Sequence, residues 1–365
     1  MFKALNIWLP AYLRQKKVPL PQDKDIHLII AICDHFEPLH NADKSKALER
    51  LNFWKKNFPL ITERFFDSDG IPPRHTFFYP IEQIDSNLLN ELKYICDKTG
   101  GEVEIHLHHK SDIAETLKEK LLNGISELQK FGFLCSDENK ATRYGFIHGD
   151  WALTNSHPKK LFCGVDNEIS VLRQTGCYAD FTMPSAPDPT QSKIINSIYY
   201  VRETGRPRSF DVGEIVKVNP QRKNDTVFSR PAIDELLLVQ GPLGLNWRSR
   251  KFGILPRIEN GNLTRLNPPT IERLKLWIKI HIHIQGKPEW IFIKLHTHGG
   301  IESNFKMLLG DPMIQFHTEL KKLCDINPHF KFHYVTAREM VNIIHSAEVG
   351  LSGEPHLFRN SRYKR

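Results

Sequence analysis

The sequence predicts an α/β fold, either a barrel or a doubly wound sheet, and two observations support this. Hydrophobic residues make up 40% and charged residues 25% of the 365 residues, a balance that excludes a disordered, collagen-like or coiled-coil chain. Along the chain, short runs of β-branched and aromatic residues alternate with helical patterns. Such an alternation predicts a parallel sheet covered by helices.

Seven strand-and-helix units follow one another. We expect strands at 26–33, 74–79, 102–108, 143–148, 176–182, 289–296 and 330–335, and helices at 42–66, 84–98, 111–131, 165–173, 270–284, 303–324 and 336–347. The stretch 185–268 interrupts this rhythm and is rich in Pro, Arg and Asn, with short strand-like runs at 211–218 and 236–240. We interpret it as a β-rich insertion between the fifth and sixth units. Its length suits a lid or substrate-contacting element, and equally a cover for the barrel wall.

The charge and the cysteines narrow the class of protein. The net charge is +8, but the basic residues are dispersed except in the lead 1–25 and the tail 348–365, so we expect a solvated surface and no nucleic-acid partner. No glycine-rich phosphate loop is present. The six scattered cysteines contain no CxxC pair, which favours reduced, mostly buried thiols over disulfides or a thiolate zinc site.

The N-terminal stretch has apolar residues at near-helical spacing with basic neighbours. It lacks the uninterrupted apolar core and cleavage site of a secretory signal, so we expect a cytoplasmic protein. The stretch can pack on the barrel, which we favour, or lie in a membrane interface. The apolar residues are Phe2, Leu5, Trp8, Leu9, Tyr12 and Leu13.

Ionisable residues gather just past the ends of the strand-like runs. In a parallel α/β barrel these ends converge on one face, where active sites lie. The density of His and Asp there is hard to explain by surface solvation alone. The residues concerned are Asp34, His35, His106, His108, His109, Asp112, His148, Asp150, Asp180, His296 and His298.

The segment HLHHKSD carries the clearest metal signal. On a strand, His106 and His108 point to the same face, and Asp112 follows one helical turn later. Two imidazoles and a carboxylate suit zinc or another divalent ion. The alternative is a solvated polar loop with one structural histidine. Asp34 and His35 can likewise be explained without a functional role, as a helix-capping carboxylate beside a half-buried imidazole.

The order of these motifs resembles the polysaccharide deacetylases, carbohydrate esterase family four. Ile32-Cys33-Asp34-His35 stands where that family has an acidic pair, and Glu104-Ile105-His106-Leu107-His108 through Asp112 resembles its His-x-x-x-His motif. Ile147-His148-Gly149, Asp180-Phe181-Thr182 and Ile293-Lys294-Leu295-His296 resemble the later motifs. The resemblance covers about residues 26–347 and implies an irregular (β/α)7 barrel of the deacetylase type, with the β-rich insertion at about 185–268.

The resemblance also implies a function. It implies a metal-dependent hydrolase that removes an acetyl group from an N-acetylated sugar or saccharide precursor, with Asp34 as base and His296 as acid. The family's ligands are permuted here to His35, His108 and Asp112, with zinc the favoured divalent metal. Further candidates are His106, His109, His148, Asp150, Asp180 and His298, and Trp151 is a candidate for stacking on a sugar, although a packed core tryptophan is the commoner explanation.

One departure from the family's motifs keeps other functions open. The arginine of the family's third motif is missing, because Arg143 lies too early in the chain. A non-catalytic sugar-binding or assembly protein on the same barrel, or a related metal-dependent carbohydrate hydrolase, are therefore the alternatives. The sequence makes no prediction of the oligomeric state.

Overall fold

The computed structural model describes residues 2–223 and 235–365, and it is a mixed α/β fold built on one large sheet. The helices are α1 (Leu5–Arg14), α2 (Lys44–Thr62), α3 (Ser86–Thr99), α4 (Ala114–Lys130), α5 (Glu168–Gln174), α6 (Ile271–Ile280), α7 (Glu302–Leu308), α8 (Asp311–Ile326) and α9 (Ala337–Glu348). The strands are β1 (Ile26–His35), β2 (Thr76–Pro80), β3 (Glu102–Leu107), β4 (Cys135–Ser136), β5 (Thr142–His148), β6 (Cys177–Asp180), β7 (Ile198–Arg202), β8 (Gly213–Ile215), β9 (Glu235–Val239), β10 (Gly244–Lys251), β11 (Leu255–Glu259), β12 (Asn262–Leu263), β13 (Trp290–Thr297) and β14 (Phe330–Tyr334).

The large sheet has a parallel centre. Its strand order is β12-β13-β1-β2-β3-β5-β6-β9-β7-β8, and β13 through β9 in this order are all parallel to their neighbours. β7 and β8 continue it antiparallel. Within the described residues no ladder joins β8 back to β12, so the hydrogen bonding does not close a complete barrel.

Two strands take different places from those the sequence predicts. The run 236–240, which we assigned to an insertion, forms β9 and pairs in parallel with β6 as part of the main sheet. The last predicted strand, β14, pairs with the first half of β1, and among the described strands it has no other partner. β2 pairs with the second half of β1 on the same side. The stretch 185–268 thus contributes to the sheet and also forms the separate hairpin of β10 and β11.

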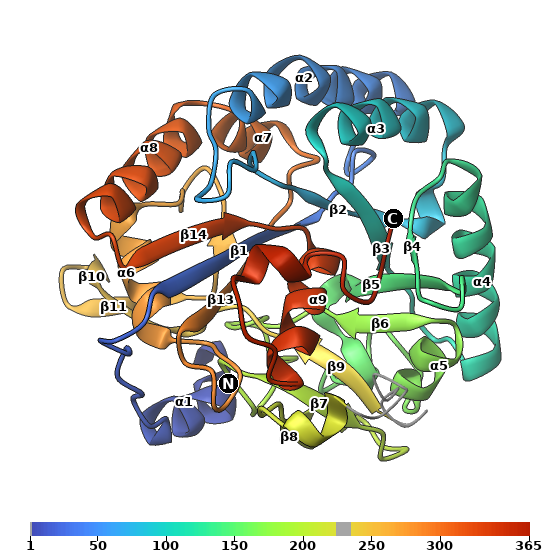
Figure 1. Ribbon diagram of the computed structural model, residues 1–365. Coiled ribbons are helices and arrows are strands. Elements are labelled where there is room, and N and C mark those ends of the chain that lie inside the picture. Colours follow the sequence, from blue (N-terminus) through green and yellow to red (C-terminus); the bar gives the residue numbers. More distant parts are fainter. Residues whose placement is uncertain (1, 224–234) are drawn as a thin grey trace.

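The two faces of the strands pack against different partners. Figure 1 shows α2, α3, α4, α5 and α8 along the outside and α9 near the centre. Odd-numbered residues of β1, such as Ile29 and Cys33, share a buried cluster with Ile344 of α9. Even-numbered residues, such as Ile30, pack with Trp54 of α2. This alternation decides which way the side chains at the end of β1 point.

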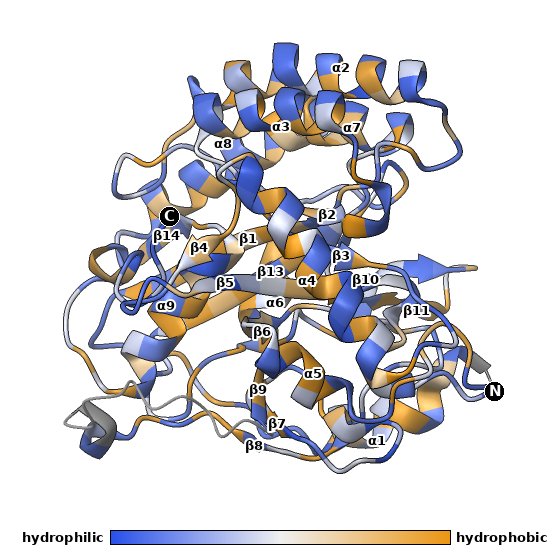
Figure 2. Ribbon diagram, turned by 90° about the vertical axis from the view of Figure 1, so that its right-hand side faces the viewer, coloured by the Kyte–Doolittle hydropathy of each residue, from blue (hydrophilic) through white to orange (hydrophobic). Residues whose placement is uncertain are grey.

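The outer helices are amphipathic, and Figure 2 shows hydrophobic and hydrophilic residues alternating along α2 and α3. Two predicted helices differ in their ends. The predicted helix 303–324 is divided at Gly310 into α7 and α8, and Pro312 lies in the first turn of α8. The predicted helix 270–284 ends at Ile280, because His281 adopts a left-handed conformation (φ 60°).

Both terminal segments pack on the core. In α1, Trp8 is fully buried in a cluster with Ile195 and Leu243. In the basic tail, Arg359 pairs with Asp67 at 3.0 Å and is buried. All six cysteines are buried and free, as the sequence predicts. No described helix combines the length and the apolar character needed to cross a bilayer.

Candidate metal centre

The carboxyl ends of β1, β3, β5 and β13 meet around an open polar cleft. Their parallel register places Cys33 beside His296 and Leu107 beside His148, so the residues that follow these strands come together. The cleft has a volume of about 530 Å³. It is lined by His35, Glu37, His40, Glu82, Gln83, His108, Asp150, Trp151 and His298.

Three potential ligands converge in this cleft. Glu37 follows β1, and its Oε1 lies 2.9 Å from His108 Nε2 and 3.5 Å from His106 Nε2. One ligand atom from each residue lies within 4.8 Å of the others. Two imidazoles and one carboxylate are the ligand set of many open zinc sites. We call this group the cleft triad.

The hydrogen bonds around His106 leave its Nε2 able to bind a cation. Its Nδ1 lies 2.8 Å from the carbonyl oxygen of Ile147, which can only accept, so Nδ1 carries the proton. In the neutral ring Nε2 therefore has a lone pair, and it is buried with no hydrogen-bond partner among the described residues. A lone pair beside the Glu37 carboxylate could hold a metal ion, and a backbone carbonyl on the other nitrogen is the usual support of such a ligand.

His108 lies between two carboxylates. Its Nδ1 is 2.6 Å from Glu82 Oε1, and its Nε2 faces Glu37. Burial lowers the pKa of His108, but hydrogen bonds to Glu37 and Glu82 outweigh it and raise the pKa to about 10. Burial likewise raises the pKa of Glu37, but its two histidine partners hold it well below the usual range. Glu82 can keep His108 oriented while Nε2 binds a metal.

Further histidines surround the triad. The ring of His35 lies 5.0 Å from that of His106 and 4.7 Å from that of His298. Burial, followed by repulsion from neighbouring histidines and Lys294, lowers the pKa of His35 and of His296 far below the usual value. Burial also lowers the pKa of His298, although Glu37 and Asp34 oppose it. These rings are therefore neutral near pH 7 and can accept protons or bind metal.

The predicted base, Asp34, lies outside the cleft lining. Because strand neighbours point to opposite faces, His35 faces the cleft and Asp34 faces Trp54 and His75. Asp34 is fully buried; its oxygens lie 2.8 Å from His75 Nε2 and accept a hydrogen bond from Gly299 N at 2.6 Å. The carboxylate thus holds the turn after β13.

The structure separates other predicted site residues from the cleft. Asp112 does not join His35 and His108; it accepts hydrogen bonds from Lys120 Nζ at 2.7 and 2.9 Å and from Thr116. Asp180 binds the N–H and hydroxyl of Thr182, and burial raises its pKa to about 7. His109, His148 and His296 are buried and do not line the cleft.

The cleft does bring several predicted residues together, and His106 is buried next to its Glu37. These residues are His35, His108, Asp150, Trp151 and His298. The sequence analysis missed Glu37 and Glu82 as site residues. In an extended chain, residues two apart point to the same face. Glu37 lies two residues after His35, as His108 lies two after His106, so this spacing could have identified Glu37 as a site residue. Glu82 lies in a turn after β2 and gives no such signal.

The comparisons with known proteins found similarity among solved structures but not among family models or curated proteins. No family model matches the sequence, and no curated protein matches it. Among solved structures, the chain is similar to one described as "putative polysaccharide deacetylase from Mycobacterium smegmatis", with 10% sequence identity and a TM-score of 0.47. The match covers 93% of this chain and 98% of that one. At this identity the likeness concerns the arrangement of elements, and we infer no chemistry from it.

Proposed function

We propose that the cleft triad binds a divalent metal ion, zinc above all, and that the protein hydrolyses the acetamide group of an N-acetylated saccharide. The observation that carries the proposal is the convergence of Glu37, His106 and His108 in an open polar cleft. The substrate class is proposed because the order of motifs in the sequence resembles that of the polysaccharide deacetylases. A zinc ion bound there would supply Lewis-acid activation of a water molecule and of a carbonyl group.

His298 is placed to move the proton in such a reaction. It lines the cleft and is neutral near pH 7, so it can accept a proton from the attacking water. The water oxygen forms the new bond to the carbonyl carbon, the carbon–nitrogen bond breaks, and the proton passes to the leaving amine. Asp34 is then a positioning residue, because it holds Gly299 next to His298.

Asp150 and Trp151 offer a surface for a sugar. Both lie in the left-handed backbone region, with φ of 53° and 54°, which costs about 1–3 kcal/mol for such residues and is typical of functional sites. Their side chains line the same cleft. A carboxylate that accepts from hydroxyls beside an indole face suits a carbohydrate ring.

Acetate release tests the proposal. The zinc-loaded protein is incubated with a panel of N-acetylated oligosaccharides, beside His298→Gln and the surface control His329→Gln, whose imidazole is mostly exposed. We expect release by the wild type and the control, and a loss of about 100-fold or more in His298→Gln, the usual contribution of a general acid–base group. Binding of the sugars without any acetate release would contradict the proposal and favour a sugar-binding protein.

A further inference from the structure

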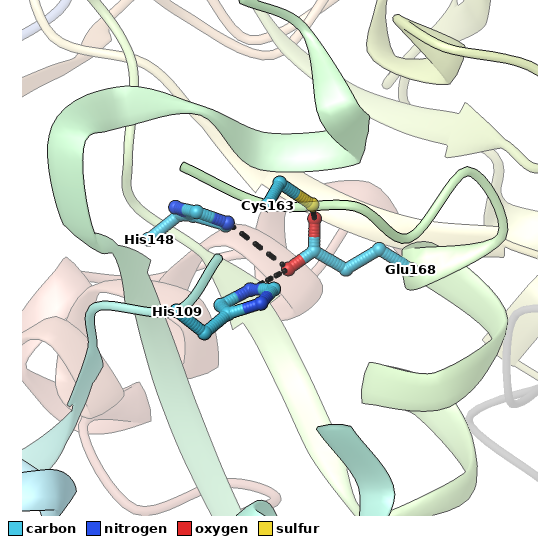
Figure 3. Close-up of side chains that lie close together, drawn as sticks. All are labelled: His109, His148, Cys163 and Glu168. Atoms are coloured by element: carbon cyan, nitrogen blue, oxygen red, sulfur yellow. Dashed lines mark hydrogen bonds and ion pairs between the residues drawn. The ribbon is translucent and has the colours of Figure 1, made fainter. Parts of the chain in front are cut away.

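A second group of potential ligands is buried close to the cleft, around the ends of β3 and β5. It comprises His109 after β3, His148 at the end of β5, Cys163 in the following loop and Glu168 at the start of α5 (Figure 3). The side chains of His109, His148 and Glu168 have no exposed surface, and Cys163 is fully buried. We call this group the buried tetrad. It is separate from the cleft triad and does not depend on the proposed function.

The distances within the buried tetrad match a small metal site. Glu168 Oε1 lies 3.2 Å from His109 Nε2 and 3.5 Å from His148 Nε2, and its Oε2 lies 3.5 Å from Cys163 Sγ. One ligand atom from each of the four residues lies within 4.8 Å of all the others. A tetrahedral zinc ion with bonds of about 2.0–2.3 Å has ligand atoms about 3.4 Å apart. The four residues thus need little movement to surround one ion.

The hydrogen bonds of His148 leave its Nε2 able to bind a cation. Its Nδ1 lies 2.5 Å from the carbonyl oxygen of Gly149, which can only accept, so Nδ1 carries the proton and Nε2 a lone pair. That lone pair has no hydrogen-bond partner in the part of the chain that the structure describes, and it points at the Glu168 carboxylate (Figure 3). Two acceptors facing each other in a buried site are unfavourable. A metal ion between them removes the conflict.

Neighbouring groups hold the other members in place. Glu168 Oε2 accepts a hydrogen bond from Thr154 N at 2.6 Å, and Cys163 Sγ accepts one from Val165 N at 3.4 Å. His109 Nδ1 lies 3.1 Å from Asp112 Oδ2, an ion-pair distance without hydrogen-bond geometry. Supporting groups of these kinds, on the far side of each ligand, are typical of metal sites.

Hydrogen bonds and ion pairs explain only part of the arrangement of these four side chains. His109 lies between Asp112 and Glu168, and the Cys163 thiol can donate to Glu168. The Nε2 lone pair of His148 would still lack a partner. We therefore propose that His109, His148, Cys163 and Glu168 bind a structural zinc ion, since two nitrogens, one thiolate and one carboxylate without an open position suit that metal and role.

Such an ion would link the two sites mechanically. It would tie the ends of β3 and β5 to α5, and His109 directly follows His108 of the cleft triad. Asp150 and Trp151 directly follow Gly149, whose carbonyl supports His148. The zinc would therefore fix the backbone from which one side of the cleft is built.

The thiolate distinguishes this site from the cleft, which contains no cysteine. We would replace the bound metal with cobalt and record the near-ultraviolet charge-transfer band from thiolate to cobalt. We expect the band in the wild type, in the cleft variant Glu37→Gln and in the control Cys324→Ser, and its loss in Cys163→Ser with loss of about one equivalent of metal. A wild-type protein without the band, or a Cys163→Ser variant that keeps it, would overturn the proposal.

X-ray absorption of the zinc-loaded wild type gives a test that needs no variant. We expect one sulfur neighbour at about 2.3 Å from part of the zinc. Zinc spectra with only nitrogen and oxygen neighbours would refute the buried site. The sulfur signal would persist if the cleft bound no metal, so failure of the proposed function and failure of the buried zinc site can be told apart.

Discussion

Substitution of Gly149 by alanine is predicted to displace a ligand of the cleft triad. A Cβ atom at residue 149 would lie 2.3 Å from Cδ2 and 2.5 Å from Cγ of His108, and 2.8 Å from its Cα. Carbon atoms in contact are normally about 3.5–4.0 Å apart, so the imidazole must move by about 1 Å or more. The backbone at residue 149 does not lie in the left-handed region, and the effect is therefore steric.

The expected cost of this substitution has two parts. Overpacking of this kind lowers the free energy of unfolding by about 1–3 kcal/mol. Metal–ligand distances tolerate only about 0.2 Å, so a shift of about 1 Å removes His108 as a ligand. We expect chelator competition to show weaker binding of the cleft metal in Gly149→Ala. The control is Gly244→Ala, whose added methyl would have side-chain atoms of Ile280 and Tyr12 as its nearest neighbours, at 3.3–3.7 Å. Unchanged metal affinity in Gly149→Ala would refute the assignment of His108.

Three further predictions concern stability. Burial raises the pKa of Asp180 to about 7, so its protonated form contributes stability that is complete below about pH 4 and is lost as the pH rises through 7. The free energy of unfolding of Asp180→Asn should therefore rise relative to that of the wild type between about pH 4 and pH 7, by up to about 1.4 kcal/mol per pH unit. A difference that does not change with pH in denaturant titrations would disprove this. Arg338 donates to Glu102 at 2.6–3.1 Å in a buried pair, so Arg338→Ala should lower the free energy of unfolding by about 3–5 kcal/mol, and a loss below about 1 kcal/mol would contradict it. Trp8 is fully buried, so Trp8→Ala should lower the free energy of unfolding by about 3–5 kcal/mol, whereas an exposed membrane-facing tryptophan would leave it unchanged.

The alternation of strands and helices was enough to predict the fold class and most of the strands. The sheet partner of a strand was not predictable in the same way. The residues of β9 formed a clear strand-like run, but their pattern does not say whether they pair within an insertion or with β6. Helix ends depended on single residues, such as the left-handed His281 and the pair Gly310 and Pro312.

The site was predictable where strand geometry controls it. The alternation of side chains placed His106 and His108 on one face, and both contact Glu37 in the structure. The alignment of motifs paired His108 with Asp112, but the chain turns after β3 and brings Asp112 to Lys120. Cys163 and Glu168 lie in a loop and at a helix start, so only the folded chain shows that they meet His109 and His148.

Anomalous diffraction at the zinc absorption edge, from crystals of the zinc-loaded protein, tests the central claim most directly. We predict an anomalous peak in the cleft at about 2.0–2.2 Å from Glu37, His106 and His108, the usual distances of zinc to oxygen and nitrogen. The peak should be absent in crystals of Glu37→Gln and present in crystals of the control His329→Gln. A zinc-loaded wild-type crystal with no peak at these three residues would contradict the assignment of the cleft as a metal centre, and with it the proposed hydrolysis.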